Sequence, residues 1–246
     1  MRTAIWAEGL KLRRSRILWI SLLASAMMPT MLGLVQAGII GTPTVEAEGT
    51  QWEQYLIMLG SLISIGGVIG FGFAFSWLFG REYSDRTVKD LLALPMSRAR
   101  VVLAKLFVAA VWCFLLAVMA FGVACLVAGL LRFEGMTGQA VATGLARYIA
   151  TACMVISLGT PVAWSASVGR GYLSSLGFVV LTMIAAQFSG ALGVAAYFPW
   201  AIPSLFSGAA GEENMHLNAV SLSIPFAIGL LGAAVTLAWW RYADQK

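Results

Sequence analysis

The sequence predicts an all-α integral membrane protein, on three observations. Of its 246 residues, 60% are hydrophobic and 11% are charged, whereas soluble domains carry about 25% charged residues. The chain also contains six apolar runs, and a membrane helix needs roughly 20 predominantly apolar residues. These runs are continuous, whereas the strands of a membrane β-barrel alternate polar and apolar residues. The predicted spans are residues 17–40, 55–79, 101–131, 141–168, 172–197 and 220–240, within a single transmembrane domain over residues 1–246.

A short helix over residues 3–14 is predicted before the first span. Trp6 and other apolar residues share one face of this helix, and Glu8 and Lys11 lie on the opposite face. Tryptophan and basic residues favour the membrane–water interface, so we expect an interfacial helix on the membrane surface. A flexible basic anchor is the alternative interpretation.

A charged segment between the second and third spans predicts another amphipathic helix, over residues 84–94. Val88, Leu91 and Leu92 recur at the i, i+3, i+4 spacing of an apolar helical face. A helix with one apolar and one charged face fits a groove on another protein. It could equally lie passively on the membrane surface.

Charges and a proline define the ends of this helix. Ser84 or Asp85 is suited to cap its start, and Glu82 and Arg86 have the i,i+4 spacing of an ion pair. Pro95 ends the helix, because proline disrupts a helix interior. Arg98 then leads into the third span.

Basic residues also occur within or between spans. Lys105 falls in the first turns of the third span, and Arg147 falls near the outer end of the fourth. We expect Lys105 to extend its ammonium group toward the lipid headgroups, so that no buried charge is required. The sequence Gly169-Arg170-Gly171 predicts a very short turn between the fourth and fifth spans.

The connection between the fifth and sixth spans contains two prolines close together. Pro199 and Pro203 flank Trp200, and prolines at this spacing argue against a continuous helix. The segment is either an outer loop or a set of short helices that re-enter the membrane.

The basic residues predict the orientation of the bundle. Fourteen of the 16 Lys and Arg residues fall at the end that carries both termini, and only Arg132 and Arg147 fall at the other end. Positive residues are enriched on the cytoplasmic side, so both termini are predicted to be cytoplasmic. The net charge of +5 then reflects topology and attraction to anionic membrane lipid, and nucleic acid is not a predicted partner.

Several kinds of chemistry have no supporting motif. The chain contains no GxxxxGK[ST] sequence, so it is predicted to bind no nucleotide through a P-loop of its own. Its single histidine, His216, excludes an HExxH zinc site, and no catalytic or metal site is predicted. No Asp or Glu lies deep within a span, which counts against proton- or sodium-coupled transport. A bundle of this kind would need a partner as its energy source.

Residues 79–98, FGREYSDRTVKDLLALPMSR, followed by Lys105, resemble the signature of type-2 ABC transporter permeases. The family pattern has an aromatic residue, a Glu, a Leu-Leu-x-Leu-Pro run and a Ser-Arg pair, with a Lys in the next span. Asp85-Arg86 departs from it, because Asp-Gly or Glu-Gly is common there. The order of six spans with cytoplasmic ends fits the family along the whole chain.

The resemblance implies that residues 84–94 are a cytoplasmic coupling helix received by a separate ABC ATPase subunit. That subunit would bind ATP and Mg, so no cofactor is expected in this chain. Glu82 and Asp85 would face basic groups of the ATPase. The residues implied in this contact are Glu82, Asp85, Arg86, Val88, Leu91, Leu92, Pro95 and Arg98, with a second cytoplasmic contact at Gly169, Arg170 and Gly171.

The resemblance also implies a second permease copy, as a homodimer or a related heterodimer, and an outer re-entrant hairpin around Pro199, Trp200 and Pro203. The implied function is a non-catalytic permease subunit of an exporter in a bacterial cell (inner) membrane. An amphipathic or hydrophobic cargo is expected, as in bacitracin or lantibiotic-immunity permeases. Two alternatives remain: an ABC-type module that moves lipid or transmits force without export, and an ATPase-independent channel or membrane scaffold.

Overall fold

The computed structural model describes residues 2–41, 49–84, 97–211 and 217–242. Every regular element within them is helical, and six helices are long and apolar enough to cross a membrane. Both predictions, all-α and six spans, are therefore confirmed. The described elements are α1 (Arg2–Arg13), α2 (Arg16–Gln36), α3 (Gln51–Ser61), η1 (Leu62–Gly66), α4 (Gly67–Ser84), α6 (Arg98–Leu130), α7 (Gly138–Val168), α8 (Tyr172–Ala191), η2 (Ala195–Tyr197), α9 (Ile202–Ser207) and α10 (Ala219–Tyr242).

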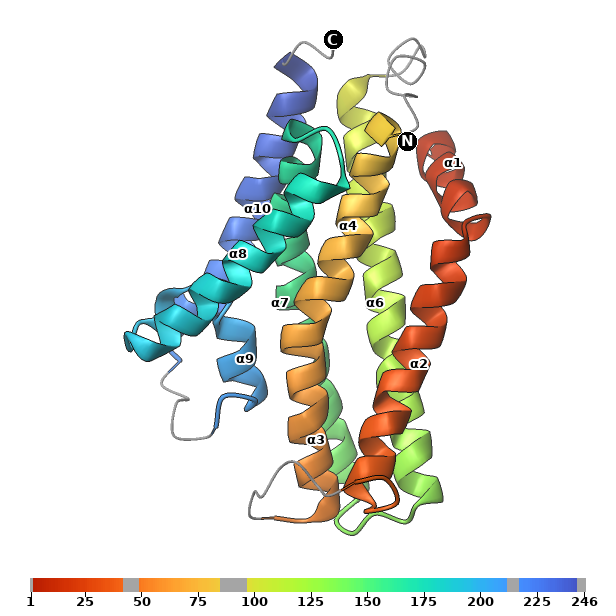
Figure 1. Ribbon diagram of the computed structural model, residues 1–246, viewed down its shortest axis with the longest axis vertical. Helices are drawn as coiled ribbons and strands as arrows, with labels where there is room; N and C mark the ends of the chain where they lie inside the picture. Colours follow the sequence, from red (N-terminus) through yellow and green to blue (C-terminus); the bar gives the residue numbers. More distant parts are fainter. Residues whose placement is uncertain (1, 42–48, 85–96, 212–216, 243–246) are drawn as a thin grey trace.

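The helices form one elongated bundle (Figure 1). Helix α1 and the end of α10 lie at the same end of it, which we call the terminal end. The opposite end carries the start of α3. The second span is built from α3, η1 and α4 in succession, so it runs without a break from Gln51 to Ser84.

Short polar residues begin several of these helices. The backbone N–H of Leu18 donates to the Ser15 hydroxyl at the start of α2. Thr50 and Glu53 form a reciprocal capping box at the start of α3. Such caps satisfy backbone N–H groups that have no partner within the helix. They explain why the spans begin at polar residues just outside the apolar runs.

Glycines end two spans earlier than the apolar runs alone predict. The first span ends at Gln36 and the fifth at Ala191, short of the predicted residues 40 and 197. Gly38 and Gly193 follow these ends with φ values of 68° and 71°. This left-handed conformation is readily adopted by glycine and terminates a helix.

Helix α7 packs closely against α10 through small residues. A Cβ atom on Gly232 would lie 2.6 Å from the backbone nitrogen of Pro161. One on Gly229 would lie 2.9 Å from the carbonyl oxygen of Ser157. The Thr160 hydroxyl also donates to the Gly229 carbonyl across this contact. Close approach through small residues is typical of helices that pack in lipid.

The second span contains one π-helical turn, η1. The N–H of Gly67 donates to the carbonyl of Leu62, five residues earlier. Within the same turn the Ser64 hydroxyl donates to the Gly60 carbonyl at 2.7 Å. A side chain thus supports the backbone where the regular i→i−4 pattern is interrupted.

Helix α9 lies beside the second and fourth spans. A Cβ on Gly60 of α3 would come within 2.9 Å of the Ser207 carbonyl oxygen. Pro203 stands in the first turn of α9, where a proline is tolerated because its missing N–H has no helical acceptor. Short helices do follow the fifth span, and membrane re-entry by this segment stays a prediction.

Candidate functional site

Four charged side chains from three helices meet at the terminal end of the bundle. Glu8 and Lys11 come from α1, Glu82 from the last turns of α4, and Lys105 from the first turns of α6. We call this group the charge cluster. It contains two carboxylates and two ammonium groups, so its charges balance.

Lys105 lies at the centre of the charge cluster. Its Nζ donates to Glu8 Oε2 at 2.9 Å, to Glu82 Oε1 at 2.8 Å and to the Leu78 carbonyl at 3.1 Å. These acceptors match the three N–H groups of an ammonium. The residue is 1% exposed, so the expectation that Lys105 extends toward the headgroups is wrong. Glu8 of α1 covers it, and a buried charge is tolerated when paired and hydrogen-bonded in this way.

Lys11 completes the charge cluster from a more exposed position. Its Nζ lies 3.2 Å from Glu8 Oε1 and 2.9 Å from Glu82 Oε1. Burial alone would lower the pKa of Lys11, but the carboxylates of Glu8 and Glu82 outweigh it and raise the pKa above its usual value. Lys11 therefore remains a cation at physiological pH.

The environment of Glu82 differs from the one that the family resemblance implied. Its carboxylate was expected to face an ATPase, whereas the residue is 3% exposed and its Oε1 atom accepts from Lys11 and Lys105. The reason is that α4 continues as regular helix to Ser84, which aims Glu82 at α1 and α6. The predicted contact residues Asp85, Arg86, Val88, Leu91, Leu92 and Pro95 lie outside the described residues.

The short turn between α7 and α8 lies beside the last turns of α4. A Cβ on Gly80 of α4 would come within 3.2 Å of the Gly171 carbonyl carbon. Arg170 in this turn is exposed and has a φ of 52°, and Gly169 ends α7. The turn is therefore adjacent to the last turn of α4, just before residues 85–96.

Arg98 follows residues 85–96 in the chain and is the first residue of α6. Its Nη1 atom is 3.5 Å from the Trp240 carbonyl, near the end of α10, where a cation complements the partial negative charge of a helix C-terminus. Trp240 is fully buried, and its indole N–H donates to the Ser167 hydroxyl at 2.9 Å. Helices α6, α7 and α10 are thus linked at the terminal end.

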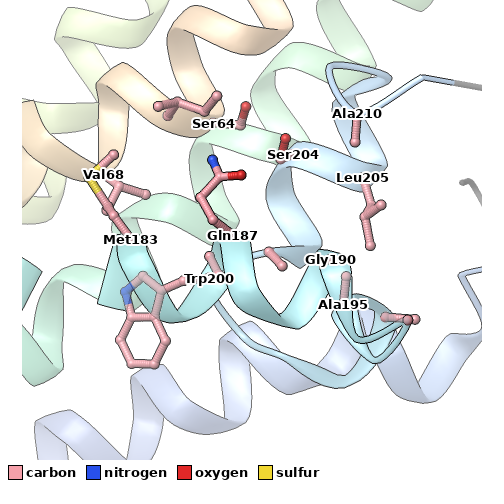
Figure 2. A pocket seen from close by; sticks show the side chains of 15 residues that line it. Ser64, Val68, Met183, Gln187, Gly190, Ala195, Trp200, Ser204, Leu205 and Ala210 are labelled. Carbon is pink, nitrogen blue, oxygen red and sulfur yellow. The ribbon is translucent and has the colours of Figure 1, made fainter. Parts of the chain in front are cut away.

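A cavity of about 400 Å³ lies farther along the bundle, between the second span, α8 and α9 (Figure 2). We call it the α8–α9 cavity. Gln187 of α8 points into it, and Ser64 of η1 and Ser204 of α9 lie at its edge (Figure 2). Trp200 also lines it and packs against Phe178, with ring centroids 5.8 Å apart. An apolar pocket with a few polar groups is typical of small-molecule sites.

Sequence comparison places this architecture in a known family. Residues 4–186 match the family model described as "ABC-2 family transporter protein". The chain belongs to the ABC-2 transporter family. The matched region includes the charge cluster and η1, and it ends within α8, before Pro199. The predicted membership of the type-2 ABC permeases is therefore confirmed.

A curated relative supports the same assignment of this ABC-2 protein. The chain is 25% identical over 186 residues to the bacitracin transport permease protein BCRB of Bacillus licheniformis. The alignment covers 74% of this chain and 88% of that protein.

The ABC-2 signature identified Glu82 and Lys105, but not their pairing or the part played by α1. Glu8 and Lys11 precede Glu82 by about seventy residues, and neither has a spacing that indicates Lys105. The only signal was the presence of two opposite charges on a helix that was expected at the membrane surface.

Proposed function

We propose that this ABC-2 protein is the permease subunit of an ATP-driven exporter for an amphipathic or hydrophobic compound. The charge cluster is the observation that carries this proposal. It holds Glu82, just before residues 85–96, and Lys105, shortly after them, within 2.8 Å of each other. A force on residues 85–96 would therefore reach α1, α4 and α6 together, as a coupling element requires.

A separate ABC ATPase would supply that force. It would bind ATP and Mg, receive residues 85–96 and contact the nearby turn at Arg170, which is exposed. Two permease copies, identical or related, would enclose the pathway. In the topology that the sequence predicts, 14 of the 16 basic residues fall on the side of both termini, which supports a cytoplasmic location for both termini in a cell membrane.

The α8–α9 cavity is the proposed first contact for cargo. Its lining is mainly apolar, with Gln187 and Ser64 among its few polar groups. Such a surface suits a compound with a large apolar part and a few hydrogen-bonding groups. Because a relative is named for bacitracin transport, a peptide antibiotic is the first cargo to test.

Co-purification tests the partnership. The chain would be purified gently from its native membrane beside two variants, Asp85→Lys in the proposed coupling segment and Arg132→Glu at the opposite end. We expect an ATPase in near-equal amount with the wild type and with Arg132→Glu, and its loss with Asp85→Lys. Glu82 is unsuitable for this test, because it is buried in the charge cluster.

Transport in proteoliposomes separates the alternatives. ATP-dependent movement of bacitracin by the complex would support export. ATP hydrolysis stimulated by cargo without its movement would favour a module that moves lipid or transmits force. Absence of any ATPase from the mild preparation would contradict the proposal and favour a channel or scaffold.

A further inference from the structure

A second cavity, of about 350 Å³, lies between α3, α7 and α9, toward the end opposite the termini. We call it the Arg147 cavity. It combines the two opposite charges of Glu53 and Arg147 with apolar and hydroxyl groups. The lining residues on which the argument depends are Glu53, Leu56, Ile57, Arg147 and Ser207.

The length of α7 places Arg147 near the boundary between the hydrocarbon core and the lipid headgroups. Helix α7 has 31 residues and is therefore about 46 Å long, whereas the hydrocarbon core is about 30 Å thick. Arg147 lies about 14 Å along the axis from Gly138. If the excess length is shared between the two ends, its Cα stands just inside the hydrocarbon boundary. Arg147 is exposed, so its guanidinium can reach the polar interface, where a phosphate or another anion can bind it.

The neighbouring helix α9 brings no anion to this guanidinium. Nη1 lies 3.9 Å from the position of a Cβ on Gly208, beside the end of α9. Among the described residues, no ion pair joins Arg147 to a carboxylate. The cation therefore borders the cavity without a charged protein partner in the described part of the chain.

Glu53 borders the same cavity but is held elsewhere. Its Oε2 atom accepts from the Thr50 N–H at 2.8 Å and from the Thr50 hydroxyl at 3.1 Å. The capping box holds this carboxylate at the start of α3, and it forms no ion pair with Arg147. The cavity is therefore bordered by one cation, Arg147, and one anion, Glu53, that are not paired with each other.

We propose that the Arg147 cavity binds the zwitterionic headgroup of a phospholipid, with its phosphate on Arg147 and its amine on Glu53. A guanidinium binds phosphate through two parallel N–H···O bonds, and the carboxylate complements an ammonium. The two protein charges balance, so a zwitterionic headgroup matches the cavity better than a headgroup with net negative charge. Leu56 and Ile57 line the adjoining wall and suit the glycerol and the first acyl carbons.

This site is independent of the proposed export function, because it requires only that the chain lies in a membrane. It also differs from the α8–α9 cavity. Ser204 borders that cavity, whereas Ser207, near the other end of the same short helix, borders this one.

Native mass spectrometry of the full chain in detergent tests the proposal. The probes are phosphatidylethanolamine, phosphatidylglycerol and glycerophosphoethanolamine, which has the same headgroup without acyl chains. We expect phosphatidylethanolamine to bind most tightly and the compound without acyl chains to bind weakly. Arg147→Gln should weaken phosphatidylethanolamine binding about tenfold, as loss of a charge-assisted contact predicts.

Matched variants identify the cause. Glu53→Gln should retain the helix cap, since Gln also serves at this position, but remove the preference for phosphatidylethanolamine over phosphatidylglycerol. Arg132→Gln and Glu134→Gln change like charges at the same end outside the cavity and should leave binding unchanged. If Arg147→Gln does not fold, Arg147→Lys keeps the charge, loses the bidentate contact and should weaken binding severalfold.

Two outcomes would overturn the lipid site. Equal effects of Arg147→Gln and Arg132→Gln would mean that Arg147 makes no specific contact with the headgroup. Equal affinities for the lipid and for glycerophosphoethanolamine would indicate a site for soluble phosphate compounds instead.

Discussion

Lys105 and Glu82 are 2.8 Å apart, and the chain between them includes residues 85–96. An ion pair therefore joins α4, which precedes the segment that resembles a coupling helix, to α6, which follows it. Glu8 adds α1 to this contact by pairing with the same lysine. Helix α1 and two spans therefore share one ionic junction.

Replacing Lys105 with Met should destabilise the bundle by about 3–5 kcal/mol, because removing one partner leaves buried charges uncompensated. Glu8 and Glu82 would keep their contacts with the half-exposed Lys11 but lose the buried ammonium between them. Thermal unfolding in detergent measures the effect. The double change Lys105→Met with Glu82→Gln should recover part of the loss. A Lys105→Met chain as stable as wild type would show that the buried ion pairs do not stabilise this junction.

The contribution of Lys11 should depend on pH in a defined direction. Its pKa is raised by Glu8 and Glu82, so its stabilising effect is fully present below the pKa of an unfolded lysine. The effect is lost as pH rises through the higher pKa of the folded state. We expect the stability difference between wild type and Lys11→Met to be about 1 kcal/mol or less near neutral pH. It should vanish in strongly alkaline buffer, and a difference that grows there would contradict the assigned ion pairs.

The contact between α7 and α10 should tolerate no added carbon at Gly232. Gly232→Ala would place a Cβ against the Pro161 backbone and should cost about 1–3 kcal/mol through overpacking. Gly122→Ala in α6 is the control, because a Cβ there meets no atom within 4 Å. That control should be neutral or stabilising by up to about 1 kcal/mol, since alanine favours a helix. Equal unfolding temperatures for the two variants would refute the close packing.

The α8–α9 cavity gives a prediction for cargo recognition. Gln187→Leu should raise the cargo concentration that half-maximally stimulates ATP hydrolysis about fivefold, the equivalent of one hydrogen bond. Gln139→Leu, at the start of α7 and outside this cavity, should leave that concentration unchanged. An unaltered response in Gln187→Leu would remove this cavity from the cargo pathway.

The sequence predicted the fold class well, because the length of an apolar run directly reflects the thickness of the membrane. It predicted less about where the spans end, since Gly38 and Gly193 act through backbone conformation rather than hydropathy. The environment of Lys105 was missed for a different reason. Whether that lysine reaches the headgroups depends on where α1 packs, and α1 is about a hundred residues distant in sequence.

The sequence contains the charged residues of the proposed lipid site, but it does not indicate that they border one cavity. The sequence places Arg147 near the end of a span. Its proximity to Glu53 follows from the packing of α3, α7 and α9 around one cavity. No periodicity within any one helix encodes that arrangement.

The π-helical turn at Leu62–Gly66 has a consequence far from its own position. A turn closed over five residues rather than four advances the rest of the helix by one residue, which is a rotation of about 100° in an α-helix. The added residue therefore sets the direction in which every side chain of α4 points around the helix axis. Glu82, about 27 Å beyond Ser64 along the axis, would swing away from Lys105 if one residue of the turn were deleted. The alignment of an ionic contact at the terminal end is thus set by a change of helical phase near the middle of the bundle.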